Sequence, residues 1–167
     1  MGTLPAYTKV AKIIHWVTAL MILTMIPVGI AMANFKLGDW GNAAYHYHRG
    51  MGFFLLVLTI IRLGWRFTHK PADLPNVIPP MQAMIAHLVH WGLYGIIILN
   101  AMLGWLGTNY WGVANIPVFG MFDLPMLVEK DRPFSDWVLF GHKVFGIMMA
   151  VLVVMHIGAA LMHHFVK

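Results

Sequence analysis

The chain has 167 residues, of which 60% are hydrophobic and only 10% are charged, and its mean hydropathy is +0.73. Soluble domains carry about a quarter charged residues, so this composition excludes a cytosolic globule and favours one membrane-embedded domain. The 11 Lys and Arg residues give a net charge of +5 but form no runs, which argues against a nucleic-acid partner. The absence of cysteine excludes disulfides, Cys-ligated zinc, iron–sulfur clusters and haem attached through Cys-x-x-Cys-His.

Four stretches are long and apolar enough to cross a bilayer as helices. A helix needs ~20 apolar residues to cross the ~30 Å hydrocarbon core. The stretches cover about residues 13–33, 49–67, 84–106 and 138–165, with Pro27 inside the first. A signal peptide is disfavoured because its apolar region would be only ~7 to 15 residues long, whereas the first stretch spans a bilayer and contains His15. We therefore expect an all-α integral membrane four-helix bundle, with residues 1–167 forming a single domain.

Charge near the span ends favours cytoplasmic termini. An even number of spans puts both termini on one side of the membrane. The side that would be cytoplasmic carries Lys9, Lys12, Arg66, Lys70 and Lys167, with Arg62 one turn deeper. The outer side carries Lys36, Arg49, Lys130, Arg132 and Lys143, together with five of the six acidic residues: Asp39, Asp123, Glu129, Asp131 and Asp136.

Ten histidines in so apolar a chain need an explanation, because ionisable residues inside a membrane are costly and point to function. A lone histidine in a span is often only a hydrogen-bonded packing residue. His142 and His156, however, are 14 residues apart on the fourth span, so they share a face and lie ~21 Å apart along its axis. His48 begins the second span from the outer side, and His15 begins the first from the inner side. Pairing by depth predicts two sites, His48 with His142 and His15 with His156.

Two histidines from different helices suit the axial positions of a haem, because one neutral nitrogen binds iron while the other N–H takes a second partner. Zinc or copper is the alternative. A two-histidine site leaves zinc short of its four ligands, and the acidic residues lie outside the spans. Iron with two axial histidines has no open position for oxygen, so the pattern predicts two b haems that transfer electrons.

Three cations are candidates for contacts with the haem propionates. Arg62 is 14 residues after His48, on the same face and at the depth of the inner pair, where an Arg fork suits a propionate. Snorkelling to the headgroups is its alternative role. Arg49 and Lys143 directly follow the two outer histidines. They would bind propionates, or they would steer a small anion such as superoxide, or an acidic redox partner, towards the outer haem.

Two further histidines lie on the third span. His87 and His90 are three residues apart and at cytoplasmic depth. If both were ligands, the inner site would have four histidines and the outer site only two. We assign both residues to contacts with propionates or with a quinone.

Several motifs together resemble the bacterial cytochrome b561 family over essentially the whole chain. They are K-I-I-H-W around His15, Y-H-R-G-M-G around His48, I-I-R-L-G-W-R after it, A-H-L-V-H on the third span, and G-H-K-V-F-G and M-H-I-G-A-A-L-M-H-H on the fourth. The resemblance implies two non-covalent b haems on the four histidines named above and electron exchange with a quinone, ubiquinone or menaquinone, in the bacterial inner membrane.

The resemblance leaves the redox partner open. Some members of the family oxidise superoxide at the outer face and pass electrons to quinone, and related cytochromes anchor dehydrogenases or hydrogenases to the membrane. We therefore expect an electron-transfer cytochrome that links an outer donor, such as superoxide, to membrane quinone. The alternative is the haem-carrying anchor subunit of a larger complex. A transporter is disfavoured because the spans contain neither an acidic residue nor an inverted repeat.

Overall fold

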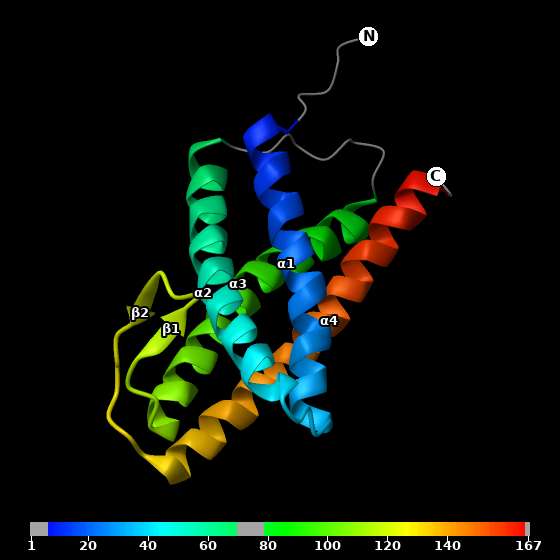
Figure 1. Ribbon diagram of the computed structural model, residues 1–167. Helices are drawn as coiled ribbons and strands as arrows, with labels where there is room; N and C mark the ends of the chain where they lie inside the picture. Colours follow the sequence, from blue (N-terminus) through cyan, green and yellow to red (C-terminus); the bar gives the residue numbers. More distant parts are fainter. Residues whose placement is uncertain (1–6, 70–78, 166–167) are drawn as a thin grey trace.

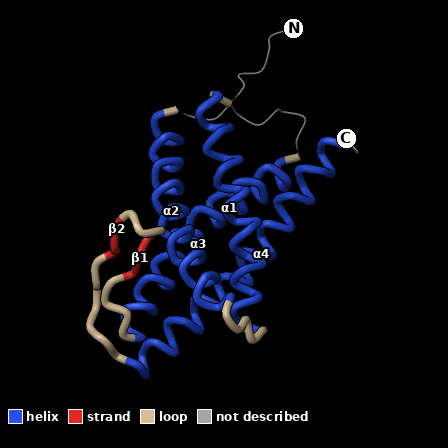
Figure 2. The backbone as a smooth tube through the Cα atoms, viewed as in Figure 1, coloured by secondary structure: helices blue, strands red, loops and turns tan. Residues whose placement is uncertain are grey.

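Four long helices account for most of the chain. The computed structural model describes residues 7–69 and 79–165. Its helices are α1 (Lys9–Asn34), α2 (Trp40–Thr68), α3 (Pro80–Trp111) and α4 (Arg132–Phe165). A small antiparallel hairpin, β1 (Ile116–Val118) and β2 (Phe122–Leu124), lies in the connection between α3 and α4 (Figure 2). All four helices are long and apolar enough to cross a membrane, which confirms the expected membrane bundle.

The helices are longer than the apolar stretches that revealed them. α2 begins at Trp40 rather than near residue 49, and α4 begins at Arg132 rather than near residue 138. The hydrocarbon thickness limits only the apolar part of a spanning helix, so its polar ends can continue into the interface. α1 passes through Pro27 without ending, as expected. Lys70 and Lys167, which entered the charge count, lie outside the described residues.

The helices pack in chain order, α1 with α2, α2 with α3, and α3 with α4. In Figure 1, α1 and α2 run side by side, α3 and α4 cross the view at a slant, and the hairpin flanks α2 and α3. We call the end of the bundle that holds the hairpin the outer end, and the end where α1 begins the inner end. All four helices meet in an apolar core, which consists of Met21, Ile22, Met25, Leu55, Ile96, Ile97 and Met149.

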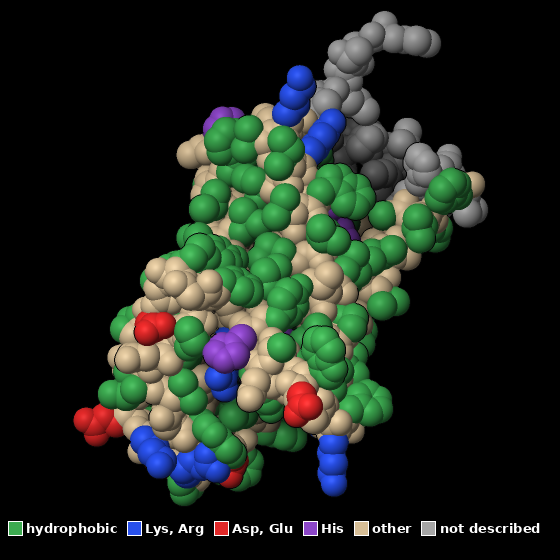
Figure 3. All heavy atoms as spheres, viewed as in Figure 1, with side chains coloured by type: hydrophobic (Ala, Val, Ile, Leu, Met, Phe, Trp, Pro, Cys, Tyr) green, Lys and Arg blue, Asp and Glu red, His purple; other side chains and the backbone are tan. Residues whose placement is uncertain are grey.

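Apolar side chains also cover the outside of the bundle. The side chains of Leu20, Leu88 and Val154 are 64–70% exposed. Each of these residues lies within three turns of the midpoint of its spanning helix. Figure 3 shows hydrophobic side chains over most of one face, with Lys and Arg gathered towards its two ends. Such a surface is stable in contact with lipid and not in contact with water.

A side-chain network ties the inner ends of α1 and α2 together. The Thr8 hydroxyl oxygen caps α1 by accepting a hydrogen bond from the Ala11 backbone N–H at 3.2 Å, and it accepts a second from the Trp65 indole N–H at 3.1 Å. The Trp65 ring in turn stacks on His69, with ring centroids 4.0 Å apart.

The outer hairpin is fixed to α2 by an aromatic ring. Its three-residue connection, 119–121, forms a turn that is closed by the Met121 N–H donating to the Val118 carbonyl oxygen at 3.0 Å. The central residues of this turn, Phe119 and Gly120, both have positive φ, 50° and 72°. A left-handed conformation is unfavourable for Phe and must be held by packing. The Phe119 ring stacks on Phe54, with centroids 6.1 Å apart, and rests so close to Gly50 that a Cβ atom there would lie 2.7 Å from the ring. The hairpin is therefore a docked part of the bundle.

Asn109, at the outer end of α3, holds both sides of the loop that carries the hairpin. It is fully buried. Its side-chain amide donates to the Val113 carbonyl oxygen at 2.8 Å, and its side-chain oxygen accepts from the Leu127 backbone N–H at 3.0 Å. One amide thus joins the segments that precede and follow the hairpin.

Replacing Asn109 by Ala should loosen this loop without unfolding the helices. The substitution removes the partners of a partly buried N–H and a partly buried carbonyl, a total cost of about 1–3 kcal/mol because water can reach each group in part. We expect faster cleavage of residues 112–131 in limited proteolysis, with the helices unchanged by circular dichroism. Asn34→Ala, which removes an exposed bond to the Ile30 carbonyl oxygen, is the matched control. Equal cleavage rates for the two variants would contradict the role given to Asn109.

Candidate functional site

Four histidines face one another in two pairs at different depths of the bundle. In the outer pair, the imidazole centroids of His48 on α2 and His142 on α4 are 5.9 Å apart, with ring planes at 89°. In the inner pair, the centroids of His15 on α1 and His156 on α4 are 6.1 Å apart, with planes at 82°. The structure thus brings together the pairs that helical spacing and depth predicted.

Both pairs bridge the space between α4 and the α1–α2 pair. Among the described residues, α4 packs extensively only along α3, and its backbone stays further from α1 and α2. Met149 belongs to the apolar core and lies midway on α4 between His142 and His156. The two histidine pairs are therefore separated by packed apolar side chains.

The ring separations fit two axial ligands on one metal ion. A metal–imidazole bond is about 2 Å, and the bonded nitrogen lies about 1.1 Å from the ring centre, so trans imidazoles on one ion have centroids roughly 6 Å apart. The described residues contain no cluster of three or more His, Cys, Asp or Glu side chains that could hold an ion alone. Two imidazoles with no further protein ligand suit haem iron, because the macrocycle supplies its other four nitrogens.

The second ring nitrogens differ between the histidines. His142 Nδ1 donates a hydrogen bond to the Asn100 carbonyl oxygen at 2.8 Å, which leaves Nε2 free to bind a metal. Nδ1 of His48 and Nδ1 of His15 are buried without a hydrogen-bond partner among the described residues. Buried unpaired polar atoms are rare in folded proteins, and these two lie at the candidate site. The contact with Asn100 was not predicted, because a backbone carbonyl leaves no signal in the residue types.

The inner pair has cations beside it. The guanidinium carbon of Arg62 lies 5.4 Å from the centre of the buried Tyr94 ring, and Arg62 is close enough to interact electrostatically with His15 and His156. Arg66 lies 5.5 Å from the Trp91 ring centre. Within the described part of the chain, neither arginine pairs with a carboxylate.

The remaining predicted residues are placed less uniformly. His90 is half-buried, with its ring centroid 5.4 Å from that of His156, whereas His87 is exposed. Arg49 is half-buried beside the Tyr45 ring, at 5.2 Å from its centre, and Lys143 is exposed. The two histidines of α3 therefore differ in their surroundings, and of the two only His90 lies next to the inner pair.

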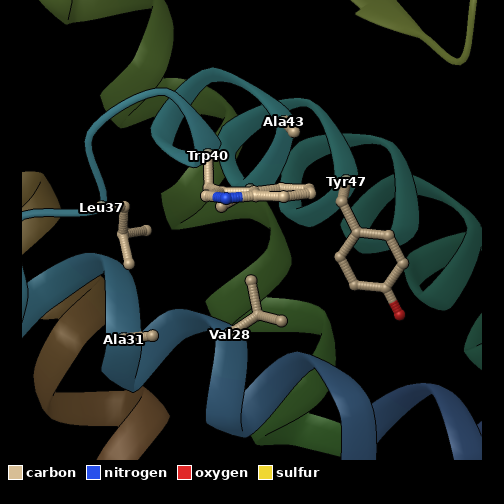
Figure 4. Close-up of a pocket in the computed structure, with 7 residues that line it drawn as sticks. Val28, Ala31, Leu37, Trp40, Ala43 and Tyr47 are labelled. Carbon is tan, nitrogen blue, oxygen red and sulfur yellow. The ribbon is translucent and has the colours of Figure 1, made fainter.

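A cavity of about 310 Å³ lies apart from the histidines, between the outer ends of α1 and α2. Its walls include Val28, Leu37, Trp40 and Tyr47, and Figure 4 shows the Trp40 indole lying across from Val28. The Tyr47 hydroxyl donates to the Thr24 hydroxyl oxygen at 2.7 Å. The walls are almost entirely apolar, and none of the four paired histidines lines them.

Comparison with known proteins gives a consistent result. The family model described as prokaryotic cytochrome b561 matches residues 6–167. Cytochrome b561 homolog 2 of Escherichia coli is 30% identical over 96% of this chain and 85% of its own length. Cytochrome b561 homolog 1 of the same organism is 27% identical, over 96% and 91%. The probable superoxide oxidase CybB of Yersinia pestis is 24% identical, over 92% and 85%.

Proposed function

The chain belongs to the prokaryotic cytochrome b561 family, and from this membership we propose that its two histidine pairs each hold one b haem. The family makes it a membrane electron-transfer cytochrome with b-type haem. We assign the outer haem to His48 and His142 and the inner haem to His15 and His156. The observation that carries this assignment is the pair of cross-helix imidazole separations, 5.9 Å and 6.1 Å. A haem held by two imidazoles exchanges single electrons and has no free axial position for oxygen.

Residues next to the two histidine pairs support this assignment. The Asn100 carbonyl oxygen fixes the protonated nitrogen of His142, so that its other nitrogen faces the metal position. Arg62 lies beside the inner pair without a described carboxylate partner, and we assign it to a propionate. Arg49 and Lys143, next in sequence to the outer histidines, are assigned to the outer propionates or to an approaching anion.

Substitution of the histidines tests the assignment. We expect His48→Ala and His142→Ala each to lose the same haem, because a single remaining histidine holds haem weakly. For the same reason, His15→Ala and His156→Ala should each lose the other haem. His46→Ala, at an exposed side chain two residues before His48, is the control and should keep both haems. Haem content per chain and low-spin absorbance spectra provide the measurement. If His90→Ala lost a haem while His15→Ala kept both, the inner pairing would be wrong.

We propose superoxide as the outer electron donor and a membrane quinone, ubiquinone or menaquinone, as the acceptor. Two superoxide anions give up two electrons and leave as two O₂ molecules, and the quinone takes these electrons with two protons to become a quinol. The name of the Yersinia relative, a probable superoxide oxidase, supports this donor. The cations Arg49 and Lys143 support the approach of a small anion at the outer end.

The rate of haem reduction by superoxide should depend on these cations and on salt. Removing one unit charge about 6 Å from the path of an anion changes its energy by roughly 0.7 kcal/mol in water, or about threefold in rate at low ionic strength. Arg49→Gln and Lys143→Gln should slow reduction by about this factor, and Lys12→Gln at the opposite end should not. Rates unaffected by both salt and substitution would leave these cations as propionate ligands. No reduction by superoxide at all would favour the anchor-subunit alternative.

We further propose that the protein lies in the inner membrane with both termini in the cytoplasm. The count of Lys and Arg is nearly equal at the two ends, but all the described acidic residues lie at or near the outer end, so the inner end, with Lys9, Lys12 and Arg66, has the larger net positive charge. Because the natural chain lacks cysteine, a single introduced cysteine reports its side of the membrane directly. A membrane-impermeant maleimide applied to intact spheroplasts should label Asp123→Cys and spare Lys9→Cys. Labelling of Lys9→Cys alone would reverse the orientation.

A further inference from the structure

Residues at two levels of the bundle repeat with the same spacing on every helix. Each helix carries one residue at the level of each histidine pair, and the two are 14 positions apart. They are His15 and Gly29 on α1, His48 and Arg62 on α2, His90 and Gly104 on α3, and His142 and His156 on α4. The inner level therefore holds three histidines and an arginine, whereas the outer level holds two histidines and two glycines.

Each outer glycine lies directly against an outer histidine ring. A Cβ atom built on Gly104 would lie 3.0 Å from Cε1 and 3.2 Å from Nδ1 of His142, and one built on Gly29 would lie 3.2 Å from Cε1 of His48. Contacts of 3.0–3.4 Å are tighter than nine in ten real Cβ contacts. Each outer imidazole thus occupies space that a side chain of the neighbouring helix would fill. Among the described glycines, none lies this close to a ring of the inner pair.

The imidazole rings of His142 and His48 differ in how far they can shift to make room for an added Cβ atom. His142 is tethered through Nδ1 to the Asn100 carbonyl oxygen at 2.8 Å, so a shift of its ring would lengthen that hydrogen bond. His48 has no hydrogen-bond partner at Nδ1, and its ring can move by a few tenths of an ångström without breaking a bond. A methyl group at residue 104 is therefore more disruptive than one at residue 29.

We propose that Gly29 and Gly104 are positioning residues, which set the ring planes of His48 and His142 and through them the electronic state of the outer haem. The proposal rests on the haem ligation proposed above. The outer planes are at 89°, and a side chain at either glycine would meet an imidazole ring, so the lack of a side chain at both residues leaves the rings free to take that angle. Protein groups around axial ligands tune a metal in this way.

Electron paramagnetic resonance reports the ring planes directly. In a low-spin ferric haem, perpendicular axial imidazoles leave two iron d orbitals nearly equal in energy, which gives a large maximum g value. Parallel imidazoles separate these orbitals and lower that value. A twist of one outer ring would therefore shift the outer signal and leave the inner signal in place, whereas a general loss of stability would affect both.

The experiment compares three glycine-to-alanine variants of the full chain. Gly104→Ala should shift the outer maximum g value downwards or reduce the haem content from two per chain to one, and Gly29→Ala should give a smaller shift. Gly95→Ala, on the same helix as Gly104, is the matched control, because a Cβ atom there meets nothing within 4 Å. All three changes raise helix propensity, so a weakened helix cannot explain a loss.

The possible results separate this inference from the proposed function. The outer signal is identified as the one that His142→Ala removes. If the parent protein carries both haems and Gly104→Ala and Gly29→Ala match Gly95→Ala in haem content and g values, the positioning role is overturned and the ligation stands. A parent protein without haem would overturn the ligation and, with it, the positioning role.

Discussion

The facing of imidazole rings across the space between α4 and the α1–α2 pair is the interaction on which the rest of the structure depends. Centroid separations near 6 Å in both pairs require α4 to lie close to α1 and α2 without packing backbone against backbone. α4 instead takes its extensive contacts from α3. The helices are long and apolar enough that lipid can stabilise their outward faces. The bundle can therefore hold imidazole pairs at two levels while the apolar core between them keeps the four helices together.

Buried hydroxyl groups in the described helices are hydrogen-bonded, whereas several polar atoms at or beside the histidine pairs are not. Thr18 and Thr59, deep in α1 and α2, donate to carbonyl oxygens of their own helices at 2.7 Å and need nothing from outside. By contrast, Nδ1 of His15, Nδ1 of His48 and the Asn100 side-chain oxygen are buried without partners. An unpaired polar atom inside a membrane is costly, so a protein keeps one mainly where it is used. These atoms lie at or beside the histidine pairs, which is consistent with a site built for a cofactor.

Helical spacing was enough to predict the bundle and which histidines would face one another, because His142 and His156 share one face and the apolar stretches fix their depth. The outer loop was not predictable in this way. Phe119 is not a residue type that indicates a left-handed turn, and its conformation depends on Phe54 and Gly50, which are distant in sequence. The 14-residue spacing from His90 to Gly104 is visible in the sequence, but its contact with His142 depends on how α3 crosses α4. Local pattern determines faces and depths, whereas tertiary packing determines contacts.

The distribution of charge along the bundle favours the proposed direction of electron flow. A nearby cation stabilises the reduced form of a redox group, because reduction adds a negative charge. At the inner pair, the half-buried Arg62 and Arg66 lie against aromatic rings with no carboxylate partner among the described residues. At the outer pair Arg49 is the one half-buried cation and is close enough to interact electrostatically with His48, Lys143 is exposed, and the described acidic residues lie towards that end. If the two pairs hold haems as proposed, this difference would favour the electron at the inner position, in the direction of the proposed transfer from an outer donor to an inner acceptor.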